Sequence, residues 1–153
     1  MSLLEVSGLK KVYKTRFGGN AVEALRNVNF SVNEGEYVAI MGESGSGKTT
    51  LLNILAALDK PTAGTVLLDG RDFTKIRESE AATFRRDHLG FVFQEFNLLD
   101  TFTLEDNIYL PLVLAGKSYD EMRTRLIDIA ETLGIRELLK KYPYEVSGGQ
   151  KQR

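Results

Sequence analysis

The spacing of hydrophobic positions along the chain changes from strand-like to helix-like near its middle. Leu3–Tyr13 and Val22–Val32 alternate loosely between apolar and polar residues and predict two strands, joined by a turn at Gly18-Gly19-Asn20. Continuous apolar runs over Glu36–Met41 and Leu89–Phe93 predict two more strands, the first of them buried. We therefore expect a sheet-based first half that begins with an antiparallel hairpin or small sheet.

Helix signals lie between these strands. Lys48–Leu58 carries leucine and isoleucine side chains on one face and predicts a helix that ends before Pro61. A further strand over Thr65–Asp69 is followed by an Asp69-Gly70 turn signal. The segment Arg71–Arg86 is rich in charge and predicts a short exposed helix with a solvated basic face.

The second half of the chain has helical spacing. Thr103 precedes acidic residues and predicts a helix start, and Pro111 should end or kink that helix. Ser118 should cap a second helix whose apolar face consists of Met122, Leu126, Ile129 and Leu133. Gly134 should stop this helix, and Arg136–Tyr142 predicts a short helix broken by the next proline.

Composition limits the classes of protein to consider. The chain has 153 residues, 42% hydrophobic residues and a formal net charge of −1, which argues against a generally basic nucleic-acid binder. It contains no cysteine and a single histidine, His88, so thiolate and multi-histidine metal centres are excluded. The first residues lack the pattern of a signal peptide, and no run reaches the roughly 18 apolar residues of a membrane span. We expect a cytoplasmic-type soluble chain.

The strongest chemical signal is the segment Gly42–Thr50, which has the pattern Gly-x-x-x-x-Gly-Lys-Thr of a loop that cradles nucleotide phosphates. Its glycines let backbone N–H groups approach an anion, Lys48 supplies a positive charge, and the Thr49 hydroxyl can ligate Mg²⁺. The predicted residues for ATP are Gly42, Ser44, Gly45, Ser46, Gly47, Lys48, Thr49 and Thr50. A glycine-rich turn without a ligand is the alternative. The predicted strand before this phosphate loop and the helix after it favour nucleotide binding.

A second candidate anion site begins at Ser147. Ser147 is a good N-cap residue, Gly148 and Gly149 leave backbone N–H groups bare, and Gln150 lies in the first turn of the predicted helix. Taken alone, this pattern fits an ordinary loop-to-helix transition equally well.

Together, the phosphate loop, Gln94 after a predicted strand, and Val146–Gln150 resemble the nucleotide-binding subunit of ATP-binding-cassette (ABC) transporters, in the family's order and near its spacing. Val146–Gln150 corresponds to the family's signature, with Val146 in place of the usual leucine. The sequences of Leu110–Gly116 and Glu145–Arg153 resemble those of the ABC-family branch that serves macrolide export, lipoprotein release and antimicrobial-peptide resistance. The resemblance is strongest to the bacitracin-type exporters.

This resemblance implies a P-loop NTPase core of α/β class with an N-terminal antiparallel β subdomain, over residues 1–95. A helical subdomain over residues 96–153 would end at the signature. By resemblance, Tyr13 stacks on adenine, and Gln94 lies near Mg²⁺ and the attacking water. Ser147, Gly148, Gly149 and Gln150 then contact ATP held by the other subunit of a head-to-tail homodimer or pseudo-dimer. Membrane permease subunits are the implied partners, and they would hold the chain at the inner face of the membrane.

The family's acidic strand, catalytic glutamate and switch histidine have no counterpart in this sequence. Val66–Asp69 imitates the acidic strand, but Gly70 follows where a glutamate is needed, and His88 precedes Gln94. We therefore expect an incomplete sheet, ATP-Mg²⁺ binding with poor hydrolysis by this chain alone, and a longer protein of which it is the N-terminal part.

Three alternatives stay open. One is a non-catalytic nucleotide-binding or dimerisation fragment. Another is a non-transport ABC protein, against which the absence of a long insertion between Gln94 and Ser147 argues. The last is an unrelated phosphate-loop kinase or GTPase, which would leave the signature unexplained.

Overall fold

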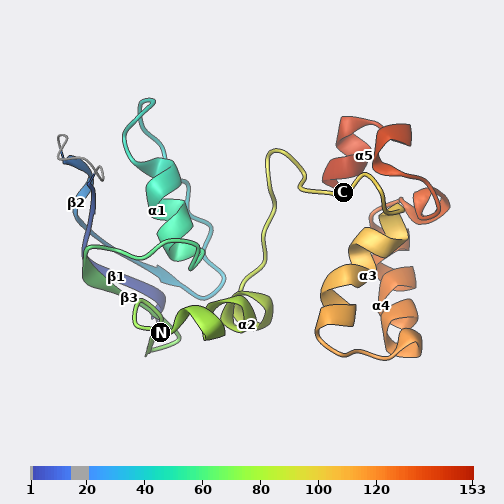
Figure 1. Cartoon of the computed structure of the whole chain (residues 1–153), viewed down its shortest axis with the longest axis horizontal. Coiled ribbons are helices and arrows are strands. Elements are labelled where there is room, and N and C mark those ends of the chain that lie inside the picture. The colour runs from blue at the N-terminus through green and yellow to red at the C-terminus, as the bar shows by residue number, and fades with distance from the viewer. Residues whose placement is uncertain (1, 15–20) are drawn as a thin grey trace. The chain divides into compact units, whose positions relative to one another are not determined.

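A computed structural model of the chain describes residues 2–14 and 21–153, so the predicted turn at Gly18-Gly19-Asn20 lies outside the described residues. The chain divides into two compact units, Met1–Leu89 and Gly90–Arg153 (Figure 1). The division of the nucleotide-binding core from the helical subdomain at residues 95 and 96 stays a prediction.

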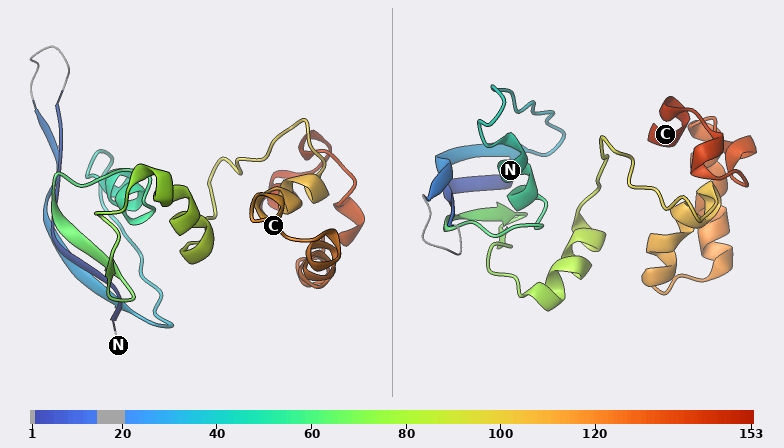
Figure 2. Two further views of the ribbon diagram at one scale, coloured as in Figure 1. Left: turned by 60° about the horizontal axis from the view of Figure 1, so that its bottom comes forward. Right: turned by 45° about the horizontal axis from the view of Figure 1, so that its top comes forward.

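The first unit is built on an antiparallel sheet. Strand β1 (Ser2–Tyr13) pairs with β2 (Val22–Asn33) and, on its other side, with β3 (Ala63–Leu68), which pairs with the short β4 (Arg71–Asp72) (Figure 2). The predicted hairpin and the third strand are therefore confirmed. Asp69 and Gly70 both have positive φ, 49° and 73°, as a tight hairpin turn requires, so Asp69 belongs to a turn and not to an acidic strand end.

Two helices cover the core of this unit. Helix α1 (Lys48–Leu55) follows the phosphate loop and buries Leu51 and Ile54, and α2 (Glu78–His88) buries Ala81 and Phe84. These side chains pack with residues of the sheet and of the segment before α2: Val6, Leu9, Leu25, Val66, Phe73 and Ile76. The predicted helix within Arg71–Arg86 is therefore confirmed, but it is not exposed on every side. Its apolar face packs on the sheet, and its charged residues lie on the other faces.

The predicted strand over Glu36–Met41 is wrong in this structure. The segment forms no ladder with the described strands, and its Tyr37 and Met41 side chains are 96% and 87% exposed. Leu89–Phe93 is likewise not a strand, although the Phe91 and Phe93 rings stack with centroids 5.6 Å apart. An apolar run becomes a strand only where a neighbouring strand takes its backbone hydrogen bonds, and no described strand pairs with either run. The sheet is open, as expected.

The second unit is helical. It contains α3 (Leu104–Leu114), α4 (Tyr119–Thr132), the 3₁₀ turns η1 (Arg136–Leu138) and η2 (Pro143–Glu145), and α5 (Gly148–Gln152). The three predicted N-caps are confirmed, because Thr103, Ser118 and Ser147 each accept a hydrogen bond from a backbone N–H of the following turn. Gly134, with φ of 62°, ends the α4 region as predicted.

Two predictions for this unit need correction. Of the two outcomes predicted for Pro111, an end or a kink of the helix, the end is wrong. Pro111 lies inside α3, because proline removes only one helical N–H and the N–H of Ala115 still donates to the Pro111 carbonyl at 3.1 Å. Met122 and Leu126 of α4 are buried as predicted, together with Ala130, but Ile129 and Leu133 are 57% and 36% exposed. Met122, Leu126 and Ala130 follow one another at four-residue spacing and lie along one face of α4, which packs in the core of this unit, and Ile129 lies beside that face.

Candidate functional site

The phosphate loop has a backbone that only glycine can provide at its critical position. Gly47, the residue before α1, has φ of 90°, and a Cβ placed there would lie 2.4 Å from the Ala24 carbonyl oxygen of β2. Gly45 also has a positive φ of 82°. The sequence thus dictates a left-handed turn pressed against the sheet, from which the chain enters α1 directly.

The Lys48 side chain folds back over this loop. Its Nζ atom donates hydrogen bonds to the carbonyl oxygens of Gly42 at 2.8 Å and Glu43 at 2.7 Å, and it lies 3.4 Å from Ser46 Oγ. The ammonium group is therefore held inside the curve of the loop by neutral acceptors alone. An anion that enters this curve meets a positive charge already in place.

The first turn of α1 adds unpaired donors. No side chain caps the helix, and its first intrahelical bond runs from the Leu51 N–H to the Gly47 carbonyl at 2.8 Å. The N–H groups of Lys48, Thr49 and Thr50 precede that bond and point out of the helix start, where the helix dipole favours negative charge. The loop lies on the surface, and the residues Gly42–Ser46 and Thr49 are exposed.

Tyr13 lies at the end of β1, in the same unit as the phosphate loop. The residue is 43% exposed, and its hydroxyl donates a hydrogen bond to Asp59 Oδ2 at 2.9 Å. The Lys11 ammonium lies over the ring, 4.9 Å from its centroid, and pairs with Asp59 Oδ1 at 2.6 Å. Reasoning from the sequence assigned no role to Lys11 or Asp59. Their opposite charges were the only signal, and 48 positions separate them.

Gln94 belongs to the second unit and lies exposed in a turn. It does not follow a strand as predicted, because residues 89–93 lack a strand partner. Two consecutive residues after it, Phe96 and Asn97, have positive φ of 60° and 54°, which is uncommon for residues other than glycine. The backbone just after Gln94 therefore turns sharply.

The signature segment forms a closed cap. Ser147 Oγ accepts a hydrogen bond from the Gln150 N–H at 3.3 Å, and Gln150 Oε1 accepts one from the Ser147 N–H at 2.8 Å. Gly148 and Gly149 do not have positive φ. A Cβ on Gly149 would meet nothing within 4 Å, and one on Gly148 would only touch the Phe96 ring at 3.8 Å. Neither glycine is required by the fold of this unit.

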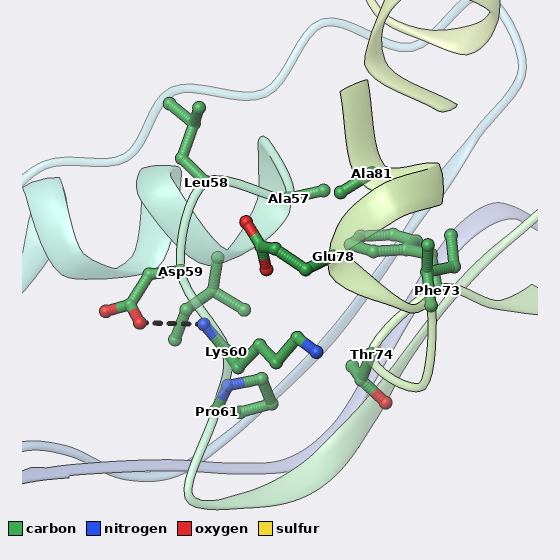
Figure 3. A pocket seen from close by; sticks show the side chains of 11 residues that line it. Ala57, Leu58, Asp59, Lys60, Pro61, Phe73, Thr74, Glu78 and Ala81 are labelled. Atoms are coloured by element: carbon green, nitrogen blue, oxygen red, sulfur yellow. Dashed lines mark hydrogen bonds between the residues drawn. The ribbon is translucent and has the colours of Figure 1, made fainter. Parts of the chain in front are cut away.

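The structure thus gathers the predicted phosphate-binding residues and Tyr13 in the first unit, and Gln94 with the signature residues in the second. A hollow of about 310 Å³ also lies in the first unit, at the far end of α1 from the phosphate loop (Figure 3). Among residues 2–14 and 21–153, no group of three His, Cys, Asp or Glu side chains is placed to hold a metal ion. In the same residues, no helix has the length and apolar character needed to cross a membrane.

Several known proteins are similar to this chain. It is 50% identical to the uncharacterized ABC transporter ATP-binding protein YvcR of Bacillus subtilis, over 100% of this chain and 59% of the relative. It is 46% identical to the bacitracin export ATP-binding protein BceA of Halalkalibacterium halodurans, over 100% of this chain and 60% of the relative. With the macrolide export ATP-binding/permease protein MacB of Brucella abortus the identity is 44%, over 95% of this chain and 23% of the relative.

Solved structures agree with these sequence matches. A dimeric structure of MJ0796, a bacterial ABC transporter cassette, superposes with a TM-score of 0.85 at 39% identity, over 97% of this chain and 65% of that one. A post-hydrolysis state of the same cassette with ADP and Pi gives a TM-score of 0.84. The expected P-loop NTPase fold is therefore confirmed. The sequence profile described as "ABC transporter" matches residues 25–153, which include both the phosphate loop and the signature segment, and the chain belongs to the ABC transporter family.

Proposed function

We propose that this chain is the ATP-binding part of an ABC exporter, which binds ATP-Mg²⁺ and couples ATP turnover to a membrane permease. The observation that carries the proposal is the Lys48 ammonium, held by the Gly42 and Glu43 carbonyls beside the uncapped start of α1. Phosphate oxygens can replace those carbonyls as acceptors and can take the free N–H groups of the first turn. Belonging to the ABC family supports ATP as the nucleotide.

The remaining residues of the first unit fit the rest of ATP-Mg²⁺. The exposed face of Tyr13 offers a surface on which adenine stacks. Thr49 presents an exposed hydroxyl in the first turn of α1, and a hydroxyl oxygen is a suitable ligand for Mg²⁺. The ion, when bound, neutralises charge on the β- and γ-phosphate oxygens. Gln94 is in the second unit, where its exposed side-chain amide is the kind of group that would serve the ion and the attacking water in the assembled protein.

The signature segment completes the site from a second protomer. The backbone conformation at positions 148 and 149 does not require glycine. Because Gly148 and Gly149 have no side chain, a γ-phosphate can approach their N–H groups closely. The Ser147 hydroxyl accepts the Gln150 N–H, so its own proton is free to be donated to a phosphate oxygen. In a head-to-tail dimer, each ATP would lie between the phosphate loop of one protomer and the signature of its partner. The dimeric structure of the MJ0796 cassette supports dimerisation.

The export role follows the names of two similar proteins, a bacitracin export ATP-binding protein and a macrolide export ATP-binding/permease protein. The chain spans about three fifths of the length of YvcR and BceA, so turnover, cargo and permease are proposed for the full-length protein. We place that protein at the inner face of the membrane, held there by its permease, without a nucleic-acid partner.

The test is calorimetric titration of the full-length protein with ATP in the presence and absence of Mg²⁺. Magnesium-dependent binding is expected, and Lys48→Ala should weaken it at least about 100-fold, because loss of one charge-assisted hydrogen bond to phosphate costs about 2–5 kcal/mol. Lys60→Ala, a change of the same kind at the far end of α1, is the control and should leave the affinity within about twofold. Binding that survives Lys48→Ala would overturn the proposal. Co-purification with a permease tests the transport role.

A further inference from the structure

The carboxylate of Asp59 joins the end of β1 to the end of the phosphate-loop helix. Its Oδ1 atom pairs with Lys11 Nζ at 2.6 Å and accepts the Lys60 N–H at 2.7 Å, the contact drawn in Figure 3. Its Oδ2 atom accepts the Tyr13 hydroxyl at 2.9 Å. Lys11 Nζ also donates to the Lys60 carbonyl at 2.7 Å. Both carboxylate oxygens are thus engaged, and they connect two segments far apart in the sequence.

This cluster is better shielded from solvent than the other ion pairs of the first unit. The Lys11 and Asp59 side chains are only 12% and 29% exposed. Burial opposes ionisation of Asp59, but the hydrogen bonds from Lys11, Tyr13 and the Lys60 N–H outweigh it and lower the pKa of the carboxyl group. Asp59 is therefore charged at neutral pH and holds both partners with charge-assisted hydrogen bonds.

The residues just before and just after α1, within the segment 47–62, contact the same part of the sheet. At its start, Gly47 is pressed against the Ala24 carbonyl of β2. Beyond its end, Asp59 holds Lys11 and Tyr13 of β1, and the Thr62 N–H donates to the Lys10 carbonyl at 2.8 Å. A single short segment therefore carries the phosphate loop at one end and the anchor of the Tyr13 ring at the other.

We propose that Asp59 is a positioning residue for the base of the nucleotide, because it fixes the Tyr13 ring and places Lys11 over one face of it. This inference rests on the proposed function, in which adenine stacks on Tyr13. With Lys11 on one side of the ring, the opposite face receives the base. Tyr13 stands at the end of a strand and is substantially exposed, so its orientation depends on its hydroxyl contact. A ring fixed before binding gives higher affinity than one that must be ordered by the ligand.

The Asp59 contact should affect only the base end of ATP, so the experiment compares a ligand with the base to one without it. Dissociation constants of Mg-ATP and of magnesium tripolyphosphate, which has no base, are measured by calorimetry for the full-length protein. Base stacking on an aromatic ring is worth roughly 5- to 100-fold in affinity, so Asp59→Asn should weaken ATP binding by about 3- to 10-fold. Tripolyphosphate affinity should stay within about twofold.

Two further variants locate the effect. Tyr13→Phe keeps the ring and removes the hydroxyl, so it should weaken ATP binding in the same direction, and adding Asp59→Asn to it should cost less than in the parent protein. The matched control is Asp72→Asn, since Asp72 is also a partly buried aspartate of the first unit with a lowered pKa, held by Thr74 and Lys75. This variant should leave the ratio of the two affinities unchanged.

Equal weakening of ATP and tripolyphosphate by Asp59→Asn would show a merely structural role and overturn the inference, as would no weakening of either. Additive effects of Asp59→Asn and Tyr13→Phe would also contradict it. Failure of the proposed function looks different: the parent protein would then bind neither ligand, or Lys48→Ala would leave tripolyphosphate binding intact.

Discussion

The starts of α1 and α5 carry the two phosphate-directed motifs of this chain, and they differ in how their backbone N–H groups are satisfied. At α1, no side chain caps the helix, and Gly47 enters it in a left-handed conformation against the sheet. At α5, Ser147 and Gln150 cap each other reciprocally, and neither Gly148 nor Gly149 needs to be glycine for conformational reasons. The first N–H groups of α1 therefore have no side-chain acceptor, whereas at α5 the side chain of Ser147 accepts one of them.

This difference assigns a different meaning to the glycines of the two motifs. Gly47 is needed for the shape of the loop, so its replacement damages the loop itself. Gly148 and Gly149 are needed, in our proposal, only by a ligand that approaches from outside the chain. A glycine that the fold does not require is therefore the sharper functional signal, because packing does not account for it.

The largest effect is expected for Gly47→Ala. A β-carbon at this position meets the Ala24 carbonyl at 2.4 Å, and the positive φ is itself unfavourable for alanine by roughly 1–2 kcal/mol. We expect the free energy of unfolding to fall by about 2–4 kcal/mol and ATP binding to become undetectable. Chemical denaturation and calorimetry measure both quantities. An unchanged midpoint would show that the loop does not need this geometry.

Gly149→Ala should separate function from stability. With no positive φ and open space around the added methyl group, the substitution should leave stability unchanged or raise it by about 0.5–1 kcal/mol, as alanine does within helices. ATP-dependent dimerisation and turnover of the full-length protein should fall at least about tenfold, while ATP affinity of the monomer stays the same. Full turnover in this variant would contradict the proposed role of the signature in the partner's site.

Ser147→Ala removes both a cap and a proposed ligand. Loss of the cap should cost about 1 kcal/mol in the free energy of unfolding. The matched control is Ser118→Ala at the start of α4, where the serine also accepts a backbone N–H of the first turn. Both variants should lose similar stability, but only Ser147→Ala should lower ATP turnover. Equal ATP turnover in the two variants would show that Ser147 acts only as a capping residue.

The smallest effect on stability is expected for a substitution in the core of the second unit, which contains the signature segment. The Tyr109 hydroxyl is buried and has no hydrogen-bond partner among the described residues, and burial together with the charge of Glu105 raises its pKa. Tyr109→Phe should therefore be neutral or stabilising by up to about 1 kcal/mol at pH 7. Because the folded pKa lies above the unfolded value of about 10, the parent protein should lose stability relative to the variant as the pH rises above that value. Thermal melts at pH 7 and pH 10.5 make the comparison.

Local sequence determined the elements whose hydrogen bonds close within a few residues. The caps at Thr103, Ser118 and Ser147 and the Asp69-Gly70 turn depend on a side chain and a backbone group no more than three positions apart. The phosphate-loop motif can be recognised in the same way, because its glycines and one lysine lie within a few positions of one another. The family could therefore be inferred from motifs alone.

Only the tertiary structure decided features that need a distant partner. Glu36–Met41 and Leu89–Phe93 have strand composition, but a strand exists only when another strand pairs with it. Whether Ala130 or Ile129 of α4 is buried depends on which face of the helix packs in the core of the second unit. The contact of Asp59 with Tyr13 and Lys11 likewise exists only because α1 ends beside β1, and local spacing carries no information about an approach across that distance in the sequence.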